Sequence, residues 1–262
     1  MALRILGMGD IRAMTNYWNQ APDNIKIIGH RGAKALWPEN TMLSFENAVK
    51  LGVDGLEMDL NLTRDGRLAV IHDETVDRTT DGKGLVSDFS MAELKGLDAG
   101  VALPGFGTQR IPEFEEYLEF VEHTNLLLNV EVKQNSPETA DKAIAALDRR
   151  GLLDRTVMTC FYGDVTTYMH QKYGVKTQGF PKHRVKGYKD DCYSHYYAIG
   201  IGMNDLTPEL VAELKAQNID PWCWCPDTAE PVEYAINCGV TLMTCNDPRA
   251  AFEILTKRGL RK

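Results

Sequence analysis

The sequence predicts an α/β protein whose main domain is a (β/α)8 TIM barrel with a small inserted cap subdomain. Its length of 262 residues is typical of one such barrel. Short apolar segments alternate with segments of helical periodicity along most of the chain. One turn-rich stretch, residues 73–110, interrupts this alternation. We therefore expect an N-terminal extension over 1–24, a catalytic barrel over 25–262 and a small insertion over 73–110.

Eight short segments are the predicted strands of the barrel. Most are nearly continuous apolar runs, as expected for parallel strands that are buried on both faces. They cover residues 26–29, 55–60, 126–133, 156–161, 176–179, 198–201, 219–223 and 241–244. A further run at 68–72 predicts a short extra strand. Alternation alone does not show that a sheet closes, so a doubly wound open sheet is the alternative.

Capping residues mark several of the predicted helices between the strands. The helix over 44–51 is followed by Gly52, and glycine is common just after a helix C-terminus. Ser136 precedes the helix over 137–150, where its hydroxyl can accept a hydrogen bond from a free backbone N–H. Pro208 follows Thr207 and suits the first position of another helix.

The charge balance argues against two classes of partner. The chain has 29 Lys and Arg against 37 Asp and Glu, which gives a net charge of −8. Nucleic acids and anionic membranes need clustered positive charge, so we expect no nucleic-acid partner. No apolar run reaches the roughly 18 residues of a membrane-spanning helix, so stable membrane insertion is not expected either.

The first residues are not predicted to be a signal peptide, because Asp10 and Arg12 interrupt any apolar stretch. Residues 1–24 are either a short amphipathic helix or a partly disordered leader, and such a helix could lie on the barrel or on another subunit of a homo-oligomer. Without an export signal we expect a cytoplasmic protein with six reduced cysteines. Cys223 and Cys225 are only one residue apart and lack a second pair, so no structural zinc is expected.

Acidic side chains stand at the ends of two predicted strands. Glu57 and Asp59 are two residues apart, and so are Glu131 and Lys133, so each pair faces one side of its strand. The C-terminal strand ends of a TIM barrel form its catalytic face, where these groups should meet. Three carboxylates held together repel one another, and one divalent cation relieves this. Oxygen ligands favour Mg²⁺ or Ca²⁺ over zinc.

Two histidines stand near the same predicted edge, because His30 ends one strand and His72 ends the extra strand. Imidazole suits both the general base and the general acid of hydrolysis at neutral pH. The guanidinium of Arg31 suits phosphate oxygens. Phe161 and Trp222 also lie at strand ends, where substrate contact and simple packing are equally good interpretations.

Together these motifs resemble the glycerophosphodiester phosphodiesterase family over about residues 26–250. The motifs that carry the resemblance are His30-Arg31-Gly32, Pro38-Glu39-Asn40-Thr41, Glu57-Met58-Asp59, His72-Asp73, Thr79-Thr80-Asp81-Gly82, Ile111-Pro112 and Glu131-Val132-Lys133, with a weaker echo at Trp222 and Asn246-Asp247-Pro248. The resemblance implies a TIM barrel that hydrolyses a small-molecule glycerophosphodiester to sn-glycerol 3-phosphate and an alcohol.

Roles for individual residues follow from the resemblance. It implies that one Mg²⁺ or Ca²⁺ is bound by three carboxylates, that two histidines act as general base and acid, and that two cations contact the phosphate. The three carboxylates are those of Glu57, Asp59 and Glu131. The two histidines are His30 and His72, and the two cations are Arg31 and Lys133. Which histidine is the acid stays open.

The sequence departs from the family pattern at three cysteines. Cys225 stands where the family often has Asn, Cys245 where Thr is usual, and Cys160 where Ser is frequent. These changes affect the pocket lining and hence the preferred alcohol. Two alternatives remain: a lysophospholipase D-like enzyme on a lipid substrate, and a binding barrel without catalysis. Charged residues in the insertion favour a soluble head group; they are Asp77, Arg78, Asp81, Lys83 and Asp88.

Overall fold

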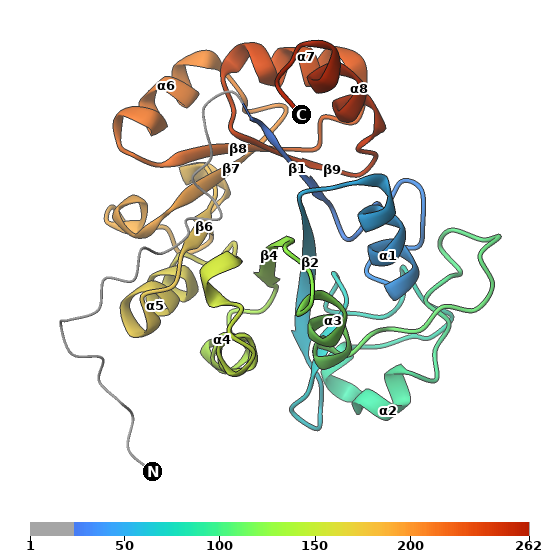
Figure 1. Ribbon diagram of the computed structural model, residues 1–262. Coiled ribbons are helices and arrows are strands. Elements are labelled where there is room, and N and C mark those ends of the chain that lie inside the picture. Colours follow the sequence, from blue (N-terminus) through green and yellow to red (C-terminus); the bar gives the residue numbers. More distant parts are fainter. Residues whose placement is uncertain (1–23, 262) are drawn as a thin grey trace.

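The computed structural model describes residues 24–261 and shows a closed barrel of parallel strands with helices outside it (Figure 1). The strands pair in barrel order, and β1 closes the ring by pairing with β2 on one side and β9 on the other. The prediction of a TIM barrel is confirmed, and the open sheet is wrong. The parallel strands are β1 (Lys26–Gly29), β2 (Gly55–Leu62), β4 (Leu127–Val132), β5 (Thr156–Thr159), β6 (Thr177–Gly179), β7 (Ala198–Gly202), β8 (Asp220–Trp224) and β9 (Leu242–Cys245).

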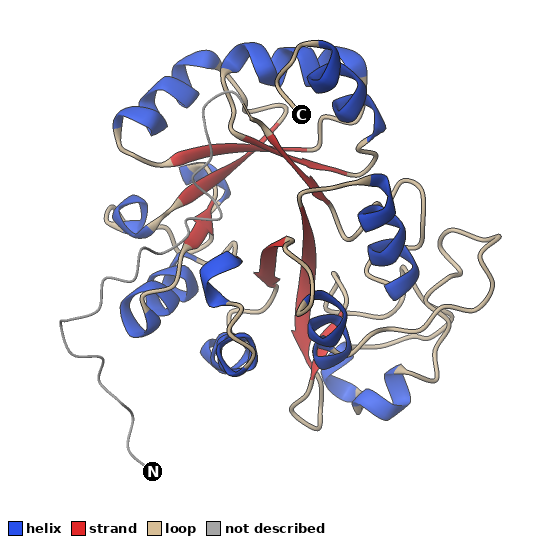
Figure 2. Ribbon diagram, in the orientation of Figure 1, coloured by secondary structure: helices blue, strands red, loops and turns tan. Residues whose placement is uncertain are grey.

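Helices cover the outside of the barrel, as Figure 2 shows by colour. The main ones are α1 (Met42–Leu51), α3 (Phe114–Val121), α4 (Pro137–Arg149), α5 (Gly163–Tyr173), α6 (Pro208–Ala216), α7 (Ala229–Cys238) and α8 (Arg249–Lys257). Short 3-10 turns η2 (Leu153–Arg155), η3 (Lys182–Arg184) and η4 (Cys192–His195) lie in connecting segments. Within 24–261, no helix has both the length and the apolarity needed to cross a bilayer.

Hydrogen bonds at the helix ends explain the observed boundaries. The hydroxyl oxygens of Ser136 and Thr207 accept hydrogen bonds from backbone N–H groups in the first turns of α4 and α6. Gly52 ends α1 with a φ of 94°, a left-handed conformation that glycine adopts without strain. The helix α1 begins at Met42, earlier than predicted, because Thr41 caps it by accepting from Ser44 N at 3.2 Å.

A small apolar cluster fills the barrel interior, separate from the large core between barrel and helices. It consists of Ile28, Leu127, Val157, Ala198, Trp222 and Leu242. Trp222 pairs in register with Leu242 and is only 2% exposed. Side chains two apart on a strand share a face, so Trp224 also points inward but lies nearer the C-terminal end of β8. These side chains fill the interior of the barrel, which is therefore packed and is not a channel.

The insertion (residues 73–110) follows β3 (Leu68–Val70), which pairs antiparallel with β2. It contains η1 (Val86–Asp88) and α2 (Met91–Leu94), joined by turns, and forms a lobe beside the barrel (Figure 1). An apolar cluster of its own stabilises this lobe, with contributions from both flanks; the buried members are Ala69, Ile71, Val76, Val86, Met91, Leu94, Ala99 and Ile111.

Candidate active site

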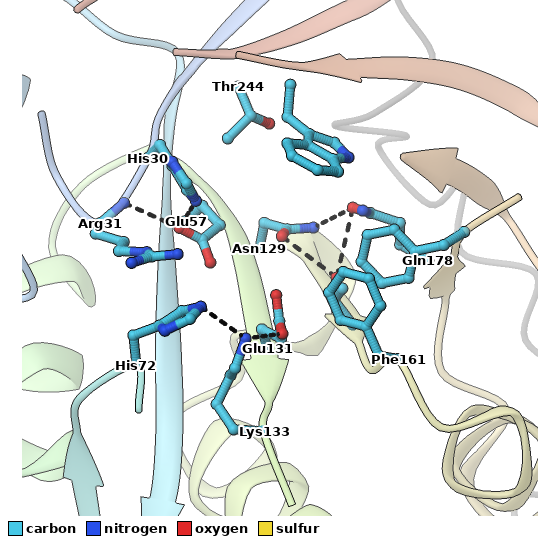
Figure 3. A pocket seen from close by; sticks show the side chains of 13 residues that line it. His30, Arg31, Glu57, His72, Asn129, Glu131, Lys133, Phe161, Gln178 and Thr244 are labelled. Atoms are coloured by element: carbon cyan, nitrogen blue, oxygen red, sulfur yellow. Dashed lines mark hydrogen bonds and ion pairs between the residues drawn. The ribbon is translucent and has the colours of Figure 1, made fainter. Parts of the chain in front are cut away.

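A pocket of about 160 Å³ opens at the C-terminal ends of the strands. Figure 3 shows histidines and carboxylates on one side of it, with Phe161 and Gln178 on the other. The lining residues are His30, Arg31, Glu57, His72, Asn129, Glu131, Lys133, Thr159, Phe161, Gln178, Phe180, Trp224 and Thr244. One wall of the pocket is therefore charged, whereas the opposite wall is aromatic and amide-rich.

Three buried carboxylates meet at the charged wall. Glu57 and Asp59 extend from β2, and Glu131 extends from β4, where it pairs in register with Asp59. One oxygen of each side chain lies within 4.8 Å of the others. The two-residue spacing and the parallel register thus bring together the three acids that the sequence singled out.

The electrostatics of this cluster suit a cation. Burial and the charge of Asp59 raise the pKa of Glu57 well above its ordinary value. Burial would also raise the pKa of Asp59, but the charges of Arg31 and Lys133 outweigh it and lower that pKa. The Oδ1 atom of Asp59 is buried without a hydrogen-bond partner. A hard divalent cation would bind this oxygen and offset the repulsion between the carboxylates, so the donor set fits one.

His30 follows β1 directly and is held by groups behind the pocket. Its Nδ1 lies 2.6 Å from Oδ1 of Asn246 and 3.4 Å from Sγ of Cys225. Its Nε2 lies 3.7 Å from Oε2 of Glu57. Burial and the charge of Arg31 lower the pKa of His30 to about 3, which makes the imidazole neutral near pH 7.

His72 lies on the same side of the pocket as His30 and has a matching arrangement (Figure 3). Its Nδ1 is 2.5 Å from Oδ1 of Asp73, and its Nε2 is 3.0 Å from Nζ of Lys133. Burial lowers the pKa of His72, and the ammonium of Lys133 acts in the same direction. Lys133 also donates to Glu131, and its ammonium lies 5.6 Å from the centre of the Phe161 ring. In each histidine, Nδ1 therefore contacts a side-chain oxygen, of Asn246 or of Asp73, and Nε2 faces a charged side chain, Glu57 or Lys133.

A chain of ion pairs joins the site to the insertion. Arg31 Nη1 donates to Glu39 Oε1 at 2.9 Å, and its Nε lies 3.2 Å from Asp59 Oδ2. Arg78, which belongs to the insertion, donates two hydrogen bonds to Glu39 and two to Asp73, over 2.6–3.2 Å. Burial alone would raise the pKa of Glu39, but hydrogen bonds from Arg78 and the charge of Arg31 lower it to about 2.

The sequence-predicted residues are found in three places. Most of them line the pocket, and these are His30, Arg31, Glu57, His72, Glu131, Lys133 and Phe161. Asp59 lies in the carboxylate cluster without being among the lining residues. Trp222 packs inside the barrel, and Trp224 lines the pocket in its place. We therefore correct the pocket tryptophan to Trp224; β8 continues one residue beyond the predicted strand.

Three polar residues of the opposite wall were not predicted. Asn129 Nδ2 donates to Gln178 Oε1 at 2.9 Å, and the Thr159 hydroxyl lies 3.3 Å from Asn129 Oδ1. The signal for Asn129 was present, because it stands two residues before Glu131 and shares its face of β4. Gln178 lies on the short β6, whose sequence offers no comparable pattern.

Comparisons with known proteins identify the family of this chain. The model of the glycerophosphoryl diester phosphodiesterase family matches residues 30–250. A protein of Caldanaerobacter subterraneus subsp. tengcongensis named glycerophosphodiester phosphodiesterase is 35% identical over 244 residues, which cover 89% of this chain and 98% of that protein.

Solved structures share the fold. A Silicibacter pomeroyi structure, described as a putative glycerophosphoryl diester phosphodiesterase, has a TM-score of 0.83 at 22% identity and covers 95% of this chain and 98% of its own. An Oleispira antarctica phosphodiesterase, solved with the product sn-glycerol-3-phosphate, has a TM-score of 0.80 at 22% identity over 88% of this chain and 96% of its own. Because the family model matches most of the chain and the Caldanaerobacter relative aligns over nearly its whole length, this chain belongs to the glycerophosphoryl diester phosphodiesterase family.

Proposed function

We propose that the chain hydrolyses glycerophosphodiesters to sn-glycerol 3-phosphate and an alcohol, with one divalent cation and two histidines. The observation that carries the proposal is the three-carboxylate cluster beside His30 and His72 at one wall of a single pocket. The name of the Caldanaerobacter relative and the product held by the Oleispira structure support the same reaction.

Glu57, Asp59 and Glu131 would hold the cation, and their oxygen donors favour Mg²⁺ or Ca²⁺. When bound, such an ion lowers the pKa of a hydroxyl and offsets negative charge on phosphate. Arg31 and Lys133, both at the pocket wall, stabilise the charge that develops on the equatorial phosphate oxygens. Ion pairs already hold the side chains of Arg31 and Lys133 in place, so these two cations need little rearrangement during the reaction.

We assign His30 as the general base, because its Nε2 lies beside Glu57, where the attacking hydroxyl would be activated. A glycerol hydroxyl of the substrate gives its proton to His30 and attacks phosphorus, and the alcohol leaves with a proton from His72. Water then opens the resulting cyclic phosphate with the histidines in reversed roles. His72 therefore enters the first step as imidazolium, which the carboxylate of Asp73 stabilises; it is neutral between the two steps and regains its proton from water in the second.

A lipid substrate is the second candidate, and one observation favours it. Three large apolar side chains of the insertion are exposed: Leu85 at 45%, Val101 at 44% and Phe106 at 37%. Exposed apolar side chains on the lobe would suit contact with the acyl chain of a lysophospholipid. Side-by-side turnover of glycerophosphocholine and lysophosphatidylcholine distinguishes the two substrate classes.

The decisive assay follows release of sn-glycerol 3-phosphate from a panel of glycerophosphodiesters. We expect turnover that a chelator abolishes and that added magnesium or calcium restores. His30→Ala and His72→Ala should each lower kcat by about 10²-fold or more. His123→Ala is the matched control, because that side chain is 86% exposed, and it should retain full turnover. Full activity in chelator, or near-normal turnover of both active-site variants, would reject the proposal.

A further inference from the structure

We propose that Asp227 is a positioning residue that acts through Asn246 to keep the His30 imidazole in its Nδ1–H tautomer, with the Nε2 lone pair toward the carboxylate cluster. Neither Asp227 nor Asn246 lines the pocket. The catalytic part of this inference rests on the proposed role of His30 as a base, whereas the tautomer itself follows from hydrogen bonds alone.

Asp227 fixes which way the amide of Asn246 points. The Oδ1 atom of Asp227 accepts from the backbone N–H of Asn246 at 2.7 Å and from that of Asp247 at 3.1 Å. Its Oδ2 accepts from the side chain of Asn246 at 2.6 Å. An ionised carboxylate only accepts hydrogen bonds, so the NH₂ end of the amide must face it. The oxygen of Asn246 is therefore the end that faces His30.

The oriented amide in turn fixes the imidazole of His30. Oδ1 of Asn246 lies 2.6 Å from Nδ1, and an amide oxygen can only accept, so Nδ1 must carry the hydrogen. A neutral imidazole has one N–H, which leaves the lone pair on Nε2, the atom 3.7 Å from Glu57. The sulfur of Cys225, 3.4 Å from Nδ1, is a weak acceptor and agrees with this tautomer.

His72 reaches the same tautomer by a shorter route. Its Nδ1 contacts the carboxylate of Asp73 directly, and its Nε2 accepts from the ammonium of Lys133. No amide lies between the carboxylate and this ring, so changes at Asp227 should leave it unaffected. His72 is therefore an internal reference in the same protein.

Asp227→Asn tests the relay with a nearly isosteric change. The two backbone N–H groups hold the new amide oxygen where Oδ1 was, so the new NH₂ group faces the NH₂ group of Asn246. Two donors cannot share this contact, and the Asn246 amide must turn over. Its NH₂ end then faces Nδ1 of His30, which favours the Nε2–H tautomer and removes the inward lone pair.

The double change Asp227→Asn with Asn246→Asp exchanges the amide and the carboxylate. The amide at 227 now donates to the carboxylate at 246, and that carboxylate again presents an acceptor to His30. Both the charge of the pair and the number of hydrogen bonds are preserved, so the Nδ1–H tautomer should return. Asp247→Asn is the control: its carboxylate binds Arg249 at the surface, and the change should leave His30 as it was.

The readout is the ¹⁵N spectrum of the histidine rings near neutral pH in chelator, together with kcat and KM in the cation-loaded protein. We expect the His30 tautomer to switch in Asp227→Asn and return in the double variant, with His72 unchanged throughout. Turnover should fall by about 10²-fold in the single variant with little change in KM, and recover in the double variant.

An unchanged His30 tautomer in Asp227→Asn, or a folded double variant that fails to restore it, overturns the relay. If Asp227→Asn does not fold, Asn246→Ala serves instead, because loss of the amide oxygen should remove the preference of His30 for the Nδ1–H tautomer. Retention of the Nδ1–H tautomer in that variant would contradict the relay. A tautomer switch in a protein without phosphodiesterase activity would sustain the relay and refute the proposed function, so the two failures are distinguishable.

Discussion

Replacing Glu57 with glutamine should stabilise the barrel in chelator and remove its stabilisation by a cation. Glu57 has the weakest charge compensation of the three acids, because its hydrogen-bond and ion-pair partners in the described part of the chain are the backbone N–H of Arg31 at 2.9 Å and His30 Nε2 at 3.7 Å. Glu131, by contrast, has an ammonium partner. Glutamine keeps the shape and can still accept from Arg31, but it carries no charge.

The sign follows from the raised pKa of Glu57, which burial and the neighbouring Asp59 cause. Ionisation of a group whose folded pKa is raised costs stability, and that cost is absent below the ordinary glutamate pKa and grows as the pH rises toward the folded pKa. Each pKa unit corresponds to about 1.4 kcal/mol. In chelator, the advantage of Glu57→Gln over the native chain should therefore increase as the pH rises above the ordinary glutamate pKa.

A bound cation reverses the order of the two proteins. At a free concentration of 100 Kd, the native chain should gain about 2.7 kcal/mol. For a protein of this size that gain raises Tm by about 5–11 °C. The glutamine variant loses one of three anionic ligands and should gain much less. Thermal unfolding in chelator and in excess magnesium or calcium measures both effects.

Glu39→Gln is the matched control, since Glu39 lies outside the carboxylate cluster. Its folded pKa of about 2 is depressed, so its stabilisation is present above the ordinary glutamate pKa and lost as the pH falls toward 2. We expect this variant to lose about 1–3 kcal/mol at pH 7 and to keep its cation-induced Tm shift. An equal cation shift in Glu57→Gln and the native chain would refute the reasoning.

Three further changes test other parts of the structure. Arg78→Ala removes four hydrogen bonds to the two carboxylates that it bridges, so kcat should fall by about 10- to 100-fold, less in Arg78→Lys; unchanged steady-state kinetics would contradict this. Trp224→Ala should lower kcat/KM with a small change in Tm, whereas Trp222→Ala should lower the free energy of unfolding by about 3–5 kcal/mol, measured with denaturant. The reverse pattern would show that Trp222 and not Trp224 is the pocket tryptophan. A Cβ at Gly32 would lie 2.3 Å from Ser44 Oγ at a φ of 85°, so Gly32→Ala should lower stability by about 2 kcal/mol or more, and a native-like Tm would show that this turn yields easily.

Local patterns predicted the strands of the barrel and its charged wall, whereas they left closure of the sheet undecided. The apolar runs mark strands buried on both faces, and the two-residue spacing of Glu57 and Asp59 sets both acids on one face of β2. Glu131 joins them because parallel neighbours in a barrel end at the same edge. These features depend only on strand geometry, which the sequence expresses directly.

Depth within the barrel was not predictable from the sequence. Trp222 and Trp224 share one face of β8, and only the stagger between strands decides that the first fills the interior and the second lines the pocket. The contact between Asp227 and Asn246 likewise joins loops that follow different strands, and no spacing along the chain encodes it.

The guanidinium of Arg78 also limits how this enzyme can be re-engineered. It reaches from within the insertion to Glu39 on a barrel loop and to Asp73 at the start of the insertion, so the lobe is not an interchangeable module. A foreign insertion grafted onto this scaffold would leave Glu39 without this counter-charge unless the donor brings an arginine of the same reach. Chimeras within the family should therefore be cut after Arg78, so that Asp73 and this arginine stay with the barrel.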